Sequence, residues 1–150
     1  MVQIRFEVDT PLSPQQVRAA ATDFSERRPQ LWSGIDPERY TVHTLGDTTA
    51  EVTEGGREFG GIWAREHYDW SEPDLVVARV LDSNIFRPGS RWELRVQPMP
   101  VGGSRVEWTS LRRPSSLKGH LVVLVLRIAG RPVLRGYLHK TLSKLEHQTA

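Results

Sequence analysis

The sequence contains no cysteine among its 150 residues. This absence excludes disulfide bonds, thiolate metal sites and cysteine nucleophiles, and it fits a reducing cytoplasm, where we expect the protein to be. The five histidines show no spacing with carboxylates that is typical of a metal site. The glycine-rich stretch 55–61 lacks the spacing of a nucleotide-binding loop. We therefore expect no metal and no other cofactor.

Long hydrophobic runs are also missing. The longest apolar stretch covers residues 121–126, followed by Ile128 and Ala129, whereas a transmembrane helix needs about 20 apolar residues. The N-terminal sequence MVQIRFEVDT alternates between apolar and polar residues, so we expect no signal peptide. The motifs of zinc fingers, RNA-recognition domains and basic zippers are absent, and we expect no nucleic-acid partner.

The net charge of +2 conceals an uneven distribution. Residues 1–104 carry 11 Lys and Arg against 16 Asp and Glu, and residues 105–150 carry 9 against 2. The basic C-terminal part can attract phosphates or an anionic membrane. The simpler interpretation is a solvated basic face of a helix.

Alternating apolar residues predict strands in most of the chain. Val2, Ile4, Phe6 and Val8 alternate with polar residues, which is typical of a strand with one buried face. After Tyr40 the pattern stays strand-like nearly to residue 113. The predicted strands in this part are 40–45, 49–54, 61–70, 75–83, 90–97 and 104–113.

Two short helices and one long helix complete the pattern. Ser13, Pro14 and Gln16 form the start signal of a first helix, which Pro29 is expected to end or bend. Asp36 and Pro37 start a second short helix. Residues 117–146 return to helical spacing, and the part from 121 to 129 is apolar nearly all round. Pro132 is expected to bend or interrupt this helix.

This order predicts an α+β fold with an antiparallel sheet of six to seven strands, because consecutive strands are joined as hairpins. The long apolar helix must cover one face of that sheet. A curved sheet around one helix leaves space between them, and this space is the natural ligand site. We expect residues 1–150 to form a single domain.

Four short phrases carry a resemblance to a known superfamily. They are residues 69–73 (DWSEP), 82–84 (DSN), 87–93 (RPGSRWE) and 118–119 (KG). With the order of elements, they resemble the SRPBCC superfamily, which includes START lipid-transfer domains, birch-pollen-type allergens and polyketide cyclase/dehydrase-like proteins. The resemblance implies a helix-grip fold: a curved sheet wrapped around a long C-terminal helix. It also implies a cavity for a lipid, a polyketide or another apolar molecule, and it transfers no catalytic residue.

The stretch from Trp63 to Val80 predicts a hairpin rich in aromatic residues. A four-residue loop would set Glu66 opposite Arg79 and place both on the same side as Tyr68. We favour this side as the concave one. Glu66 and Arg79 are then either a polar anchor inside the cavity, with Arg79 suited to a carboxylate or enolate, or an exposed salt bridge of little energetic weight.

Further candidates come from the second hairpin and the long helix. Trp92 is predicted opposite Trp108, and such a pair suits either core packing or a flat apolar ligand. Leu124 and Ile128 are the predicted helical wall of the cavity. His120, at the start of the helix, is a candidate general acid or base if it does not merely pack or cap the helix.

Three functions remain open at this point. The first is carriage or sequestration of a hydrophobic molecule, with Trp92, Trp108, Leu124 and Ile128 as wall and Tyr68, Glu66 and Arg79 as anchor. The second is an aromatase/cyclase or dehydratase acting on a polyketide in the same cavity, with Glu66 or His120 among the proton-transferring groups. The third is a module that binds a membrane surface or a partner through its basic C-terminal helix.

Overall fold

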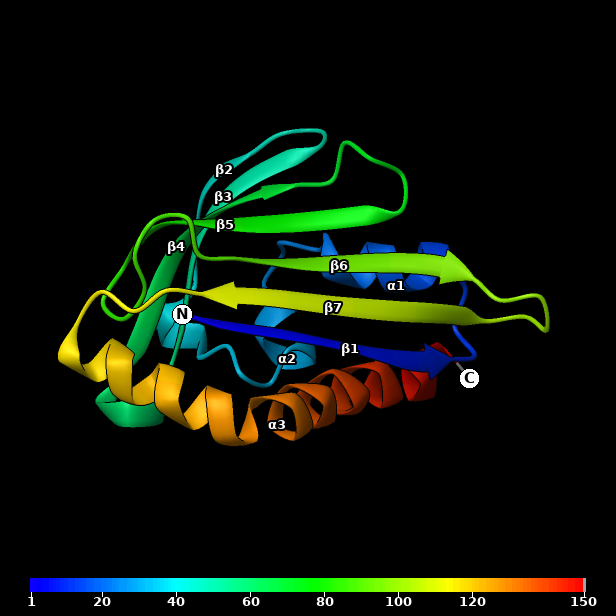
Figure 1. Ribbon diagram of the computed structural model, residues 1–150. Helices are drawn as coiled ribbons and strands as arrows, with labels where there is room; N and C mark the ends of the chain where they lie inside the picture. The colour runs from blue at the N-terminus through cyan, green and yellow to red at the C-terminus, as the bar shows by residue number, and fades with distance from the viewer. Residues whose placement is uncertain (150) are drawn as a thin grey trace.

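Seven antiparallel strands form one curved sheet in the computed structural model, which describes residues 1–149 (Figure 1). Their order across the sheet is β1-β7-β6-β5-β4-β3-β2, so the two edges are formed by β1 and β2. The strands are β1 (Val2–Thr10), β2 (Thr41–Leu45), β3 (Thr49–Gly56), β4 (Ile62–Asp69), β5 (Leu75–Ser83), β6 (Arg91–Pro98) and β7 (Ser104–Arg112).

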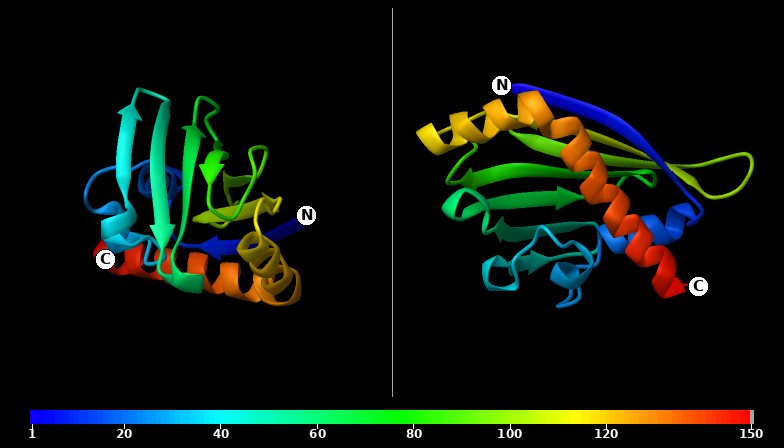
Figure 2. Two further views of the ribbon diagram at one scale, coloured as in Figure 1. Left: turned by 90° about the vertical axis from the view of Figure 1, so that its left-hand side faces the viewer. Right: turned by 90° about the horizontal axis from the view of Figure 1, so that it is seen from below.

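The alternation seen in the sequence decides which face of the sheet is buried. In β1 every second residue is buried, beginning with Val2, and β7 repeats this pattern with Val106 and Trp108. The buried faces of the strands line the concave side of the sheet, against which the helices pack (Figure 2). Tyr68 and Glu66 of β4 are on this side, as predicted.

The short segments follow the capping signals only in part. Helix α1 (Pro14–Ala21) begins with the predicted capping box of Ser13 and Gln16 but ends well before Pro29. A separate one-turn helix, α2 (Arg28–Leu31), then forms around that proline and was not predicted from the sequence. The predicted second short helix is the 3₁₀ turn η1 (Pro37–Arg39), capped by Asp36. Another 3₁₀ turn, η2 (Glu58–Gly60), lies in the glycine-rich loop.

Helix α3 (Leu117–Thr149) crosses the concave side next to β1 (Figure 1). It continues through Pro132 and bends in its middle part (Figure 2). Its first turn packs closely against the main chain at Ile85. A Cβ on residue 119 would collide with the carbonyl oxygen of Ile85, which explains the glycine in the phrase 118–119. No helix of residues 1–149 combines the length and the apolar character needed to cross a membrane.

Candidate functional site

A cavity of about 390 Å³ lies between the concave face of the sheet, α2, η2 and α3. Aromatic and aliphatic side chains make up most of its wall. From the sheet, Tyr68 of β4, Trp92 of β6 and Trp108 of β7 contribute to this wall. Helix α3 contributes Val122, Leu126, Val133, Leu134 and Tyr137. The volume falls within the range that small-molecule sites usually occupy, about 300–1,000 Å³.

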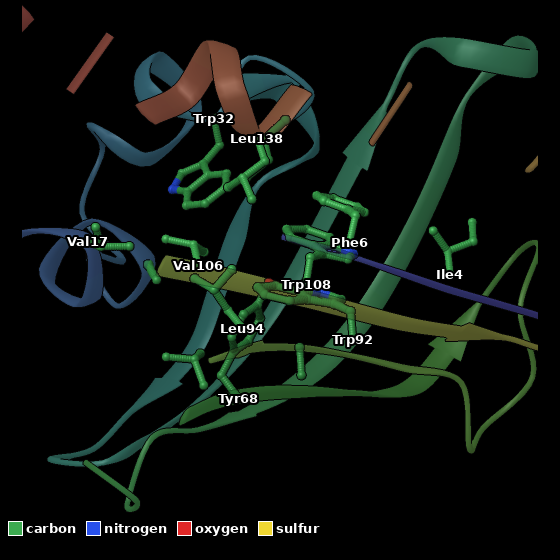
Figure 3. Close-up of a cluster of buried hydrophobic side chains, with 14 of the residues drawn as sticks. Ile4, Phe6, Val17, Trp32, Tyr68, Trp92, Leu94, Val106, Trp108 and Leu138 are labelled. Carbon is green, nitrogen blue, oxygen red and sulfur yellow. The ribbon is translucent and has the colours of Figure 1, made fainter. Parts of the chain in front are cut away.

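The two tryptophans form a flat part of the wall. Trp92 and Trp108 stack with their ring centroids 4.8 Å apart and their planes within 4° of each other (Figure 3). Phe6 continues the stack on the other side of Trp108, at 6.1 Å. The predicted register was wrong by two residues, because Trp92 pairs with Ser110. An even error keeps side chains on the same face, so the two rings still meet as diagonal neighbours.

A buried ion pair lines the cavity. The Arg28 side chain is only 2% exposed, and its Nε donates to Glu54 Oε1 at 3.1 Å. The Tyr68 hydroxyl donates to the same oxygen at 2.7 Å. Arg28 also donates to the carbonyl oxygens of Ala21 and Asp23, and its guanidinium lies 4.4 Å from the centre of the Phe24 ring. Its donors are thus committed to the protein itself, and Arg28 fixes the wall.

Glu66 lies beside this cluster in a less satisfied environment. It is 7% exposed, and its Oε2 has no hydrogen-bond partner among the described residues. Burial raises the pKa of Glu66 and the nearby Glu54 adds to the rise, while Arg112 and Arg28 oppose it, and the resulting pKa is about 7. Near neutral pH this carboxyl group therefore exchanges a proton readily, which an ordinary glutamate does not do.

Arg112 brings a second cation to the cavity. It comes from the end of β7, and its Nε donates to Ser110 Oγ at 3.0 Å. Its guanidinium lies 5.0 Å from the centre of the Phe86 ring, a cation–π contact. Arg112 lines the cavity, and its positive charge favours the ionised form of Glu66 and so lowers the pKa of that carboxyl group.

Arg79 is the first correction to the predicted site. Glu66 pairs with Val80, and Arg79 pairs with His67, on the convex side where Arg79 is exposed. The register of β4 and β5 differs by one residue from the predicted hairpin, and it shifts again between Arg65 and Glu66. A slip of one residue moves a whole strand to the opposite face, so the expected Glu66–Arg79 pair does not form.

The helical wall is the second correction. Leu124 is 51% exposed and Ile128 is 78% exposed, and neither lines the cavity. Their neighbours Val122 and Leu126 face inward instead. Because residues 121–129 are apolar nearly all round, the hydrophobic pattern did not specify which face of the helix turns toward the sheet.

His120 lies outside the cavity as well. It is exposed, and its Nδ1 lies 2.8 Å from the carbonyl oxygen of Ser116, one turn earlier in the helix. The first turn of α3 thus directs this ring to solvent, so His120 is not placed to exchange protons with a ligand in the cavity.

The mouth of the cavity is largely apolar, with Glu58 of η2 as an exposed acidic residue at its edge. Phe59 and Trp63, from the loop and strand around η2, line the cavity and yet are 42% and 36% exposed. Val133 of α3 also lines the cavity and is 60% exposed. Phe59 has a positive φ of 54°, and glycines at 60 and 61 follow it. Lys118 Nζ donates to the carbonyl oxygen of Gly61 at 2.9 Å and ties this loop to α3.

Several residues of the site were not found from the sequence. Arg112 and Glu54 could have been, because they continue the inward alternation of Trp108 and Val52 in their strands. Arg28 gave no such signal, since α2 is a single turn without periodicity. Trp32 and Tyr137, whose rings pack 6.1 Å apart, come together only through the tertiary contact of α2 with α3.

Comparison with known proteins agrees with this architecture. The sequence profile of the family described as "Polyketide cyclase / dehydrase and lipid transport" matches residues 1–147. The chain belongs to this family. The resemblance to the SRPBCC superfamily and the predicted helix-grip fold are thereby confirmed. Membership in the family supports hydrophobic ligand binding or a polyketide cyclase role.

Solved structures of the same fold come from several organisms. A protein from Thermus thermophilus superposes with a TM-score of 0.80 at 14% identity, covering 99% of this chain and 100% of the other. The Zhui aromatase/cyclase from Streptomyces sp. R1128 gives 0.80 at 11% identity, over 99% and 96% of the chains. A START superfamily protein from Mycobacterium smegmatis gives 0.78 at 12% identity, over 99% of each. No curated protein sequence matches the chain.

Proposed function

We propose that the protein binds a hydrophobic small molecule, such as a lipid or a polyketide, and carries or sequesters it. The observation that carries the proposal is the cavity of about 390 Å³ under the concave sheet, with its largely apolar wall. The stacked rings of Trp92 and Trp108 offer a flat surface on which a ring system can pack. Tyr68, Glu66 and Arg112 supply the few polar groups that orient such a ligand.

Native mass spectrometry of the freshly purified protein, followed by denaturing extraction, tests this proposal first. We expect a stoichiometric apolar molecule that is released on unfolding. In parallel, the stripped protein is titrated with N-phenyl-1-naphthylamine, a neutral probe that fluoresces in apolar sites. The proposal would be contradicted if the purified protein held no bound molecule and the stripped protein did not increase the fluorescence of the probe.

A matched pair of variants localises the probe. Ala64→Trp adds an indole ring to a residue that lines the cavity, and we expect at least tenfold weaker probe binding. Arg79→Trp adds the same ring to the exposed convex face and should leave the probe affinity unchanged. Equal affinities in the two variants would place the probe outside the cavity.

One observation favours a second candidate function, that of a polyketide aromatase/cyclase. Glu66 is a buried carboxyl group inside the cavity with a pKa of about 7, which suits a general acid and base near neutral pH. As carboxylate it would take a proton from the carbon between two ketones. The resulting enolate carbon would bond to a second carbonyl carbon of the chain, whose oxygen takes the proton back, and loss of water would follow.

The variant Glu66→Gln separates the two functions, because it keeps the size of the side chain and removes its ionisation. If the protein is an enzyme, turnover of a poly-β-ketone to a ring product should fall at least 100-fold while the affinity for the naphthylamine probe stays the same. His120→Ala serves as the control, since His120 faces solvent. Absence of any product from the wild-type protein would leave binding as the function.

A further inference from the structure

The first half of α3 exposes an unusual amount of apolar surface. Five large aliphatic residues of this half are between 41% and 89% exposed: Leu117, Leu121, Leu124, Val125 and Ile128. Their spacings of four, three, one and three residues place them on one face of the helix. We call this surface the outer stripe. Contiguous apolar patches on a protein surface usually mark a site of interaction.

The outer stripe lies next to the mouth of the cavity. Lys118, in the first turn of α3, holds the carbonyl oxygen of Gly61 and so fixes the helix to the loop that carries Phe59 and Trp63. Seen from below, α3 and the η2 loop lie on the same side of the molecule (Figure 2). The exposed rings of the mouth and the aliphatic side chains of the stripe thus face the same surroundings.

Basic residues accompany this apolar surface. Residues 117–149 carry six Lys and Arg and a single acidic residue, Glu146. Arg127 and Arg131 follow Leu124 by three and seven residues, which places them beside the stripe, and both are exposed. An apolar helix face bordered by arginines is the pattern of helices that lie in the interface of an anionic membrane.

We infer that the outer stripe and the mouth of the cavity dock on the surface of a lipid bilayer with anionic headgroups. The aliphatic side chains enter the boundary of the acyl chains, and the arginines contact the headgroups. The mouth then opens toward the bilayer. If the proposed binding function holds, an apolar molecule passes between membrane and cavity without crossing water. A second copy of the chain fits this surface less well, because a twofold contact would bring the arginines of both copies together.

Vesicle sedimentation tests the inference. The wild-type protein is mixed with vesicles of phosphatidylcholine alone or with 30% phosphatidylglycerol, at low and at high salt. We expect binding to the anionic vesicles that weakens at least fivefold at high salt, together with a blue shift of tryptophan emission. The blue shift should shrink in Trp63→Phe. No binding to anionic vesicles at low salt would overturn the inference.

Two double variants identify the surface. Leu124→Ser with Ile128→Ser should weaken vesicle binding at least tenfold, and both positions are exposed, so the fold should remain intact by circular dichroism. Leu45→Ser with Val101→Ser, at exposed apolar positions away from α3, is the matched control and should bind as the wild type does. Equal loss in both would overturn the assignment of the surface.

Oligomeric state provides the competing outcome. Light scattering at micromolar concentration should show a monomer for the wild type and for the Leu124→Ser, Ile128→Ser variant. A wild-type dimer that this variant dissociates would make a second copy the occupant and overturn the inference. Binding of the naphthylamine probe from aqueous solution should be the same in all these variants. Vesicle binding therefore tests membrane docking, and probe binding tests the cavity, independently of each other.

Discussion

The two faces of the sheet carry the same kinds of charged residue under opposite conditions. On the concave side, Glu54 of β3 pairs with Arg28 of α2, which is 2% exposed and is also held by Tyr68 and main-chain carbonyls. On the convex face, Arg5 is 64% exposed and pairs with Glu107 at 2.8 Å. Both pairs look alike when only distances are compared, but only the first has lost its water. Burial, and not bond length, gives an ion pair its energetic weight.

The largest expected effect comes from breaking the concave pair. Arg28→Ala would leave the carboxylate of Glu54 and the hydroxyl of Tyr68 without their cation in a nearly dry environment. Removal of one partner of a buried pair typically costs about 3–5 kcal/mol. Urea denaturation should show a loss of stability of this size. A loss below about 1 kcal/mol would mean that water reaches the pair.

The next effect concerns the pH dependence of stability. The pKa of Glu66 is about 7 in the folded protein, against 4.5 for an ordinary glutamate. The folded state therefore binds this proton more tightly than the unfolded chain does. The stabilisation that comes from protonated Glu66 is complete below pH 4.5 and is lost as the pH rises through 7. With about 1.4 kcal/mol for each tenfold difference in proton affinity, the loss amounts to roughly 3 kcal/mol.

Glu66→Gln removes this proton-linked loss. Between about pH 4.5 and about pH 8, urea denaturation should show the free energy of unfolding of the variant rising by roughly 3 kcal/mol relative to that of the wild type. Glu51→Gln, on the convex face, is the matched control with the opposite sign. The hydrogen bond from Arg65 lowers the pKa of Glu51. The free energy of unfolding of the wild type should therefore rise relative to that of Glu51→Gln as the pH rises from the acid range. Parallel curves for wild type and Glu66→Gln would contradict the raised pKa.

A smaller effect compares two neighbours in β5. Val80 is 2% exposed on the concave face, whereas Leu81 is 42% exposed. Val80→Ala removes buried methyl groups and should cost about 2 kcal/mol. Leu81→Ala should change the free energy of unfolding by less than about 0.5 kcal/mol, although it removes more atoms. The reverse order would show that the register of β5 is the one first predicted from the sequence.

The smallest effect is expected from the exposed pair. Arg5→Ala should leave the midpoint of urea denaturation unchanged within error, because the pair is hydrated and its gain is offset by ordering two long side chains. Addition of salt should make no difference between this variant and the wild type. A clear salt-dependent loss would indicate that the convex pairs of β1 and β7 act as a network.

Much of the fold was predictable because it rests on local patterns. The period of two predicted the strands, and the capping residues Ser13 and Asp36 predicted the starts of α1 and η1. The inward side of β4, with Tyr68 and Glu66, was also correct. Trp92 and Trp108 met despite a wrong register, since the error was even. These features depend on residues close in sequence, or only on whether a register error is an even or an odd number of residues.

The sequence by itself determined the order of the strands and of the long C-terminal helix, and the apolar nature of the cavity wall; it favoured the concave side of β4 without deciding it. Only the tertiary structure decided that Arg79 lies outside the cavity, that Leu124 and Ile128 face away from it, and that Arg28 lines it. The physical reason is the same in each case. A one-residue register, the rotation of a helix that is apolar all round, and the position of a one-turn helix are each set by packing against distant residues.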